Sequence, residues 1–257
     1  MWQLDPDTPL PLWKPQLRDP TPETVLAFTT RRGGVSAPPF DSLNLGRSTT
    51  DRADAVIENR RRVLTVLGLD PARVVTAGQV HGADVSRASA PGHIPGCDAL
   101  LTTTPGLGLA VTTADCMSLL YTAPGVVAAA HSGWRGTAAG MPVSTLEAVR
   151  EAGQVSPRDV TVHFGPCIRG CCYEVGREVA ALFPAEAISW SGDSCRLDLP
   201  TVARLQLDAA GVAAIHDTGA CTACEPAWYF SHRRDHGACG RHWAVAALCD
   251  VRNGGRV

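Results

Sequence analysis

The hydrophobic residues of the chain fall into short groups whose spacing is helical in some stretches and strand-like in others. In residues 53–67, the apolar positions approximate one face of a helix. Gly68 follows directly, and a glycine in that place commonly ends a helix. The same reasoning predicts helices over three further ranges, which are residues 137 or 141 to 151, 175–183 and 199–210.

Shorter apolar runs, roughly four to eight residues long, predict strands between these helices. The predicted strands cover residues 25–30, 74–85, 108–112, 118–121, 126–131 and 160–164, and residues 243–248 form either a strand or a helix. The stretch RRGGVSAPPF is predicted to be a loop, and residues 1–24 an extended lead-in without helix. The chain shows no repeat or linker, so we expect a single domain over residues 1–257 with a layered, mixed α/β (α+β) fold.

Composition and charge exclude several classes of function. The hydrophobic fraction of 45% is typical of a globular core, and the net charge of −2 provides no basic field for nucleic acid or an anionic membrane. We see no signal peptide, and no apolar run approaches the roughly 18–20 residues of a membrane span. We therefore expect a cytoplasmic protein that binds a small molecule, as a monomer or small homo-oligomer.

The chain contains 10 cysteines, for which a disulfide framework is not expected without an export signal. Metal binding, catalysis and core packing are the remaining explanations. The most informative cysteine is Cys116 in TTADC, because His81 in QVHG and His131 in AAAHSGWRG likewise lie at the ends of apolar runs. Packing of these residues in a core without metal is the structural alternative.

A predicted hairpin relates Cys116 to His131. If residues 122–125 form the turn, Tyr121 lies opposite Val126, and Cys116 lies opposite His131. Cross-strand partners have Cβ atoms about 4.5–5.5 Å apart, which suits two ligands of one ion, although a bulge would break this register.

With His81 as a third ligand, a fourth coordination position stays open, as in catalytic zinc sites. Such a metal activates water or polarises the substrate. Asp115 adjoins Cys116 and is a candidate general acid or base, or an orienting partner of a ligand.

Two further cysteine groups carry weaker signals. Cys221 and Cys224 form a C-x-x-C that could belong to a structural zinc site or consist of buried thiols. The candidate partners downstream are His236, Cys239 and His242. Cys171 and Cys172 are adjacent and are predicted to pack in the core.

Two arginine groups suggest anion binding. Arg233 and Arg234 in SHRRD could bind phosphate or form a structural ion-pair cluster. The stretch from Arg31 to Gly34 could be an anion-binding loop or a flexible turn.

Seven motifs occur in order along the chain, and these are TTRRGGVSAPPFDSLNLG, QVHGADV, CDALLTT, AVTTADC, AAHSGWRGTAAG, FGPCIRGCCYEVG and FSHRRDHGACGR. Together they resemble the YfiH-like family, whose members have been named laccase-domain proteins, polyphenol oxidases, peptidoglycan editing factors and purine nucleoside phosphorylases. The resemblance extends from about residue 29 to about residue 248.

The resemblance implies a zinc ion bound by His81, Cys116 and His131. It also implies phosphorolysis of adenosine, inosine or guanosine to a base and ribose 1-phosphate, with methylthioadenosine cleavage and adenosine deamination as related activities. The implied fold is similar to the catalytic domain of cytotoxic necrotizing factor toxins. The substrates are then a nucleoside and phosphate, and the candidate residues for binding them are Arg31, Asn44, Arg135 and Arg233.

The sequence departs from the family pattern at four positions. The resemblance therefore does not establish which residues line the substrate site. The family commonly has Tyr at the position of His232 and Thr at that of Cys239, and Cys167 and Cys224 are unusual.

Three other functions compete with a zinc phosphorylase. A copper oxidase would need many histidines in H-x-H pairs, which this chain lacks, although copper can occupy the predicted trio. A metal-free cysteine hydrolase would use Cys116 as nucleophile and His131 as base, with an amide or peptide substrate in peptidoglycan precursor quality control. A non-catalytic binding protein would keep the zinc for structure.

Overall fold

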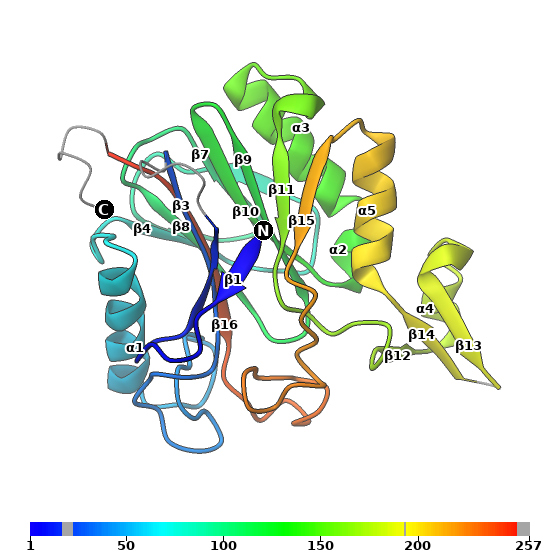
Figure 1. Cartoon of the computed structure of the whole chain (residues 1–257), viewed down its shortest axis with the longest axis horizontal. Helices are drawn as coiled ribbons and strands as arrows, with labels where there is room; N and C mark the ends of the chain where they lie inside the picture. Colours follow the sequence, from blue (N-terminus) through cyan, green and yellow to red (C-terminus); the bar gives the residue numbers. More distant parts are fainter. Residues whose placement is uncertain (17–22, 193, 251–257) are drawn as a thin grey trace.

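Two sheets packed face to face form the centre of the computed structural model, and helices cover their outer faces (Figure 1). The structure describes residues 1–16, 23–192 and 194–250. The first sheet contains, in spatial order, β1 (Trp2–Leu4), β2 (Leu12–Pro15), β3 (Thr24–Thr29), β16 (His242–Leu248), β8 (Gly108–Thr113), β4 (Val74–Ala77) and β6 (Gly92–Ile94). The second contains β15 (Ala214–Asp217), β11 (Thr161–Phe164), β9 (Met117–Ala123), β10 (Val126–Ser132), β7 (Ala99–Thr102) and β5 (Val85–Arg87).

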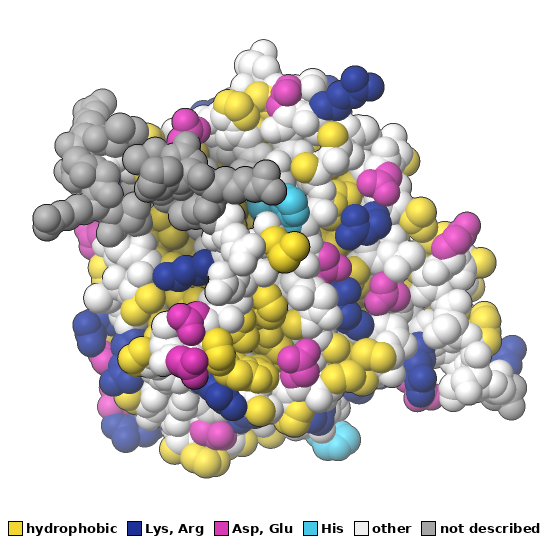
Figure 2. Space-filling view, in the orientation of Figure 1, with side chains coloured by type: hydrophobic (Ala, Val, Ile, Leu, Met, Phe, Trp, Pro, Cys, Tyr) yellow, Lys and Arg dark blue, Asp and Glu magenta, His cyan; other side chains and the backbone are white. Residues whose placement is uncertain are grey.

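The helices lie on opposite sides of this pair of sheets (Figure 1). They are α1 (Ala53–Val66), α2 (Trp134–Ala138), α3 (Met141–Gly153), α4 (Arg177–Ala180) and α5 (Leu199–Ala209), with short 3₁₀ turns at Pro157–Asp159 and Ala185–Ala187. A third, small sheet of β12 (Glu174–Val175), β14 (Ser194–Leu197) and β13 (Ile188–Ser191) stands out from the body, as the space-filling view also shows (Figures 1 and 2).

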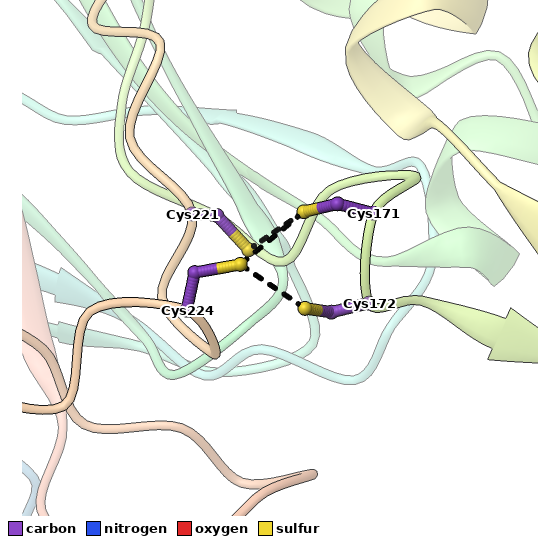
Figure 3. Close-up of side chains that lie close together, drawn as sticks. All are labelled: Cys171, Cys172, Cys221 and Cys224. Carbon is purple, nitrogen blue, oxygen red and sulfur yellow. Dashed lines mark hydrogen bonds between the residues drawn. The ribbon is translucent and has the colours of Figure 1, made fainter.

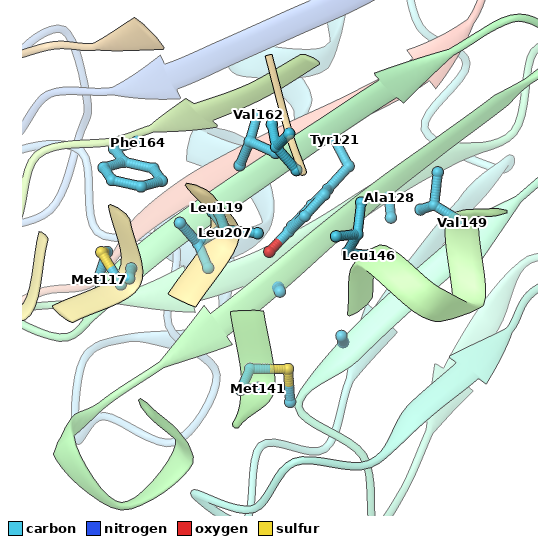
Figure 4. Packing of buried hydrophobic residues seen from close by; sticks show 14 of the residues in the cluster. Met117, Leu119, Tyr121, Ala128, Met141, Leu146, Val149, Val162, Phe164 and Leu207 are labelled. Carbon is cyan, nitrogen blue, oxygen red and sulfur yellow. The ribbon is translucent and has the colours of Figure 1, made fainter. Parts of the chain in front are cut away.

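The central strands are apolar at nearly every position because both of their faces are covered. In β16, Ala244 and Ala246 pack between the two sheets, whereas Val245 packs against Val63 of α1 on the outer face. On the other side, α3 and α5 cover the second sheet, where Tyr121 is fully buried (Figure 4). The mixed α+β class is confirmed, and its layers run helix, sheet, sheet, helix.

Most of the predicted elements are confirmed. The helices near residues 53–67, 141–151 and 199–210 are present, and residues 243–248 belong to a strand. The helix predicted over 175–183 is confirmed only at Arg177–Ala180, because Val175 pairs with Cys195 of β14 and the chain after Ala180 leaves the helix. Two segments of the predicted lead-in are strands, with β1 at the edge of the first sheet and β2 next to it, while residues 17–22 lie outside the described residues.

The register predicted for the β9–β10 hairpin is wrong. Ala123 pairs with Val126 and Ser118 pairs with His131, so the turn consists of Pro124 and Gly125 alone. Gly125 has a φ of 72°, which the second central position of a tight turn of type II requires. Cys116 consequently lies just before β9 instead of directly opposite His131.

The described helices and the charges on one face of the molecule bear on contact with a membrane or a nucleic acid. No helix in these residues has the length and apolar content to cross a bilayer. On the face in Figure 2, acidic and basic side chains are interspersed.

The buried side chain of His163 is expected to lower the free energy of unfolding in acid. Burial, with the nearby His216 charge, lowers the pKa of His163 from 6.5 to about 3. Between these values the unfolded chain takes up a proton that the folded protein does not, so the free energy of unfolding falls as the pH falls, by up to about 1.4 kcal/mol per pH unit. We expect His163→Phe to remove this contribution in urea unfolding of metal-free protein between about pH 5 and 7. Equal slopes for the two proteins would contradict the prediction.

Candidate metal centre and cavity

Asp98 organises the loop that carries His81. Its carboxylate is fully buried and accepts backbone N–H bonds from Val80 (3.0 Å), His81 (2.9 Å) and Gly82 (2.8 Å). Successive N–H groups can converge on one anion because the backbone bends sharply here, with positive φ values of 55° at Gln79 and 63° at His81. The strand predicted over residues 74–85 therefore ends at Ala77, and QVHG is a turn.

His131 reaches the same carboxylate from strand β10. The odd-numbered residues Val127 and Ala129 face the gap between the two sheets, and strand alternation puts His131 on that side too. Its Nδ1 lies 2.9 Å from Asp98 Oδ1. Burial would raise the pKa of Asp98, but bonds from His131 and from the Gly82 N–H hold it below its usual value. The carboxylate thus accepts a hydrogen bond from the Nδ1–H of His131, so Nε2 is the ring nitrogen available to a ligand.

Cys116 completes a group of three donors. One side-chain donor atom from each of His81, Cys116 and His131 lies within 4.8 Å of the other two. The rings of His81 and His131 meet edge to face, with centroids 4.9 Å apart. Although the predicted register is wrong, the structure brings these three predicted residues together, because the turn at Asp98 supplies His81.

The surroundings of Cys116 lower the pKa of its thiol and favour the thiolate. Burial would raise its pKa, but the charge and hydrogen bonds of His131 and His81 hold it at about 6. Burial conversely would lower the pKa of His131, while the Cys116 thiolate and Asp98 raise it to about 9. A thiolate beside two imidazoles is a donor set for zinc or copper, so the residues fit the metal that the motifs imply.

Gly133 leaves the space that the Cys116 sulfur occupies. A Cβ at this position would lie 2.9 Å from Cys116 Sγ and 3.4 Å from His81 Cδ2. The φ of Gly133 is −76°, so the backbone itself would accept another residue.

We therefore expect Gly133→Ala to displace the thiolate and weaken metal binding by at least about tenfold. Gly108→Ala is the matched control, since a Cβ there meets its nearest neighbour at an ordinary 3.5 Å. Metal affinity is measured by competition with a chelator. The prediction fails if both variants bind metal like the wild type.

A cavity of about 520 Å³ opens onto the three donors. Its wall also contains four arginines, which are Arg47, Arg60, Arg233 and Arg241. Within the described residues none of the four makes an ion pair with a carboxylate. Cavities of this size commonly bind small molecules, and unpaired guanidinium groups attract anions.

Arg60 is the most informative of these cations. It is only 8% exposed, its Nε donates to the Leu45 carbonyl at 2.9 Å, and its guanidinium lies over the Trp243 ring. Burial, and then the charge of Arg47, lowers the pKa of Arg60 to about 9. A buried cation without a carboxylate partner among the described residues is a candidate ligand for an anion.

The sequence reasoning missed Asp98 and three cavity arginines, although a signal for Arg60 was present. Arg60 lies four residues after Val56 and four before Leu64, so it belongs to the buried stripe of α1. A cation on an apolar stripe points to a buried partner or ligand.

The other predicted residues lie in different settings. The Asp115 carboxylate lines the cavity wall but accepts bonds from Thr222 Oγ1 (2.6 Å), Ser231 Oγ (3.0 Å) and the Arg233 N–H (2.6 Å). These bonds tie the loop of Cys116 to two distant segments, so the protein's own donors engage the Asp115 carboxylate.

Arg31 and Asn44 are held by the protein's own groups and do not line the cavity. Arg31 donates to the Asp41 carbonyl and carboxylate and to the Pro226 carbonyl. Asn44 is fully buried, and its oxygen accepts the N–H groups of Gly46 (3.0 Å) and Arg241 (2.9 Å). It thereby positions the segments that bear Arg47 and Arg241.

Arg135 is exposed and stacks on Trp134 at 4.2 Å. Arg233 lines the cavity, whereas Arg234 forms an ion pair with Asp235 and bonds to backbone carbonyls. Of the four predicted anion-binding residues, the structure thus brings only Arg233 to the cavity.

The family model described as multi-copper polyphenol oxidoreductase laccase matches residues 25–249. The chain belongs to this family. A purine nucleoside phosphorylase of Deinococcus radiodurans is 42% identical over 243 residues, covering 91% of this chain and 93% of that protein. The purine nucleoside phosphorylase YfiH of Escherichia coli is 39% identical over 226 residues, covering 84% and 91%.

Solved structures of this laccase-like family share the fold. YlmD from Geobacillus stearothermophilus superposes with a TM-score of 0.89 at 35% identity, covering 97% of this chain and 99% of that one. The hypothetical protein YfiH of Bacillus licheniformis gives 0.86 at 30% identity, covering 95% and 98%.

Proposed function

We propose that this protein is a zinc-dependent purine nucleoside phosphorylase that converts adenosine, inosine or guanosine and phosphate to the base and ribose 1-phosphate. The observation that carries the proposal is a single cavity lined by both the three-donor group and four arginines that form no ion pair with a carboxylate among the described residues. The names of the relatives support the same activity. Residues 1–257 would act as one catalytic domain.

In this proposal His81, Cys116 and His131 hold the zinc. When bound, zinc supplies a Lewis acid next to the substrate. Asp98 keeps the Nδ1 proton on His131, so that Nε2 is the donor. Copper could occupy the same donors, and metal analysis of the purified protein decides between the two.

The arginines would hold phosphate against the ribose. An oxygen of phosphate forms a bond to C1′ as the C1′–N9 bond breaks, and the electron pair of that bond leaves with the purine, which takes up a proton. Arginine contacts lower the repulsion around the phosphate dianion and fix its direction of attack. The deep position of Arg60 makes it the principal phosphate ligand, and Arg47, Arg233 and Arg241 complete the site.

The direct test is the release of base from inosine with and without phosphate. Release that requires phosphate, together with one ribose 1-phosphate for each base, supports phosphorolysis. Release of equal size without phosphate would replace the proposal with hydrolysis. Adenosine and methylthioadenosine as substrates test the related activities, because adenosine deamination yields inosine instead of adenine.

Arg60→Gln is expected to raise the KM for phosphate by about 10- to 100-fold, since one or two charge-assisted hydrogen bonds are lost. The KM for the nucleoside should change little, because the side chain contacts the anion. Arg61→Gln is the matched control on the same helix, where Arg61 faces solvent and pairs with Glu58. A phosphate KM that is unchanged in Arg60→Gln would move the anion site elsewhere in the cavity.

One observation favours a second function. Asp98, His131 and Cys116 form a chain of carboxylate, imidazole and thiolate, as in cysteine hydrolases. His81 has no role in such a mechanism, whereas it is a natural third metal ligand. A metal-free preparation that still cleaves an amide substrate would favour the hydrolase.

A further inference from the structure

Two loops beside the cavity are joined by hydrogen bonds to backbone carbonyls. The Thr222 N–H donates to the Cys167 carbonyl at 3.0 Å, and Arg169 Nε donates to the Ala220 carbonyl at 3.2 Å. An ion pair between Arg169 and Asp217 adds to these bonds. This pairing brings Cys171 and Cys172 of one loop to the same place as Cys221 and Cys224 of the other.

Four sulfur atoms converge where these loops meet (Figure 3). The Cys171 Sγ lies 3.5 Å from that of Cys221 and 3.4 Å from that of Cys224, and Cys172 Sγ lies 3.2 Å from Cys224 Sγ. All four sulfurs are within 4.8 Å of one another. Four thiolates at about 2.3 Å around a tetrahedral zinc ion lie roughly 3.8 Å apart, so the cluster has the dimensions of one ion.

The burial of these residues does not explain their grouping. Cys171 and Cys224 are exposed and Cys172 is half-buried, so the core packing predicted for Cys171 and Cys172 is wrong. The C-x-x-C also lacks its predicted downstream partners, because its neighbours are the two adjacent cysteines. Adjacent residues can serve one ion here because the chain turns at Arg169, whose carbonyl accepts the Cys172 N–H at 2.8 Å.

We propose that Cys171, Cys172, Cys221 and Cys224 bind one zinc ion, separate from the ion proposed at His81, Cys116 and His131. Four thiolates close all tetrahedral positions, which is typical of a structural zinc site. The thiols release their protons to solvent as they bind.

The position of this cluster suggests that the ion would stabilise the segments around the cavity. Tyr173 follows Cys172 and lines the cavity. Thr222, inside the C-x-x-C, donates to Asp115, which precedes Cys116. The ion would therefore fix the cavity wall and the loop of Cys116 at once, without contacting substrate.

The test compares metal content and ligand type in the full chain. We expect about two zinc ions per wild-type chain, and about one in both Cys224→Ser and Cys116→Ala. In Cys116→Ala, X-ray absorption should find only sulfur ligands at about 2.3 Å. Cys249→Ser is the control, because Cys249 lies outside both clusters and should leave the content at about two.

If Cys224→Ser does not fold, the Cys116→Ala protein still decides the test. Cys116→Ala retains all four cysteines of the thiolate cluster. Its remaining zinc is also independent of nucleoside turnover, so failure of the phosphorylase proposal does not affect this result. Cys116→Ala protein without metal, zinc with nitrogen ligands, bound iron, or a mass showing a disulfide within the cluster would each overturn the proposal.

Discussion

Cys116→Ala is expected to reduce phosphorolysis of inosine by about 10³-fold or more. The thiolate is the one anionic donor of the three-donor group, and its loss leaves two imidazoles that bind the ion weakly. Loss of the several kcal/mol that a metal contributes to a transition state corresponds to at least this factor. The measurement is kcat/KM at saturating phosphate, with metal content determined on the same samples.

The Cys97→Ala variant serves as control, since Cys97 is buried near the Asp98 turn but belongs to neither cluster. It should keep its metal at the three-donor group and most of its activity. If Cys116→Ala loses this metal but keeps full phosphorolysis, the metal takes no part in the reaction. A wild type without metal there, inactivated by the same substitution, would favour the cysteine hydrolase.

Asp98→Asn is expected to lower metal affinity by about 10- to 100-fold and the free energy of unfolding by roughly 2–4 kcal/mol. One carboxylate oxygen accepts bonds from the His81 N–H and His131 Nδ1, and the other accepts those of Val80 and Gly82. An amide can replace only one of these oxygens, so its NH₂ group must face two N–H donors in either orientation.

Chelator competition measures the change in affinity, and urea unfolding of metal-free protein measures the change in stability. Asp84→Asn is the matched control, because Asp84 is exposed and close in sequence to His81. Equal affinities in the two variants would show that the Asp98 charge does not determine how the histidines present their nitrogens.

The sequence predicted the helices and strands that depend on the spacing of residues close together in the chain. Helices α1 and α5 follow from apolar spacing with a glycine after each, and the central strands follow from apolar runs. The trio of His81, Cys116 and His131 was likewise visible, because each residue ends such a run.

The remaining features depend on partners distant in the chain. The QVHG turn exists because Asp98, from another motif, accepts its N–H groups, and periodicity does not encode such a contact. The hairpin register changed because Pro124 and Gly125 suffice for the turn, so Thr122 and Ala123 extend β9. Arg31 was expected to bind an anion, but in the folded chain its guanidinium donates hydrogen bonds to the carbonyls of Asp41 and Pro226.

The place of β16 in the first sheet has a consequence for synthesis on the ribosome. This strand is the last in the described chain, yet it lies between β3 and β8. Until it emerges, those two strands present unpaired edges, and the sheet that supports the turns on either side of the cavity is open. The nascent chain therefore already carries all of the proposed metal donors while it lacks the strand that closes the first sheet. We expect this interval to be the one in which the chain is most prone to aggregate and to bind the wrong ion.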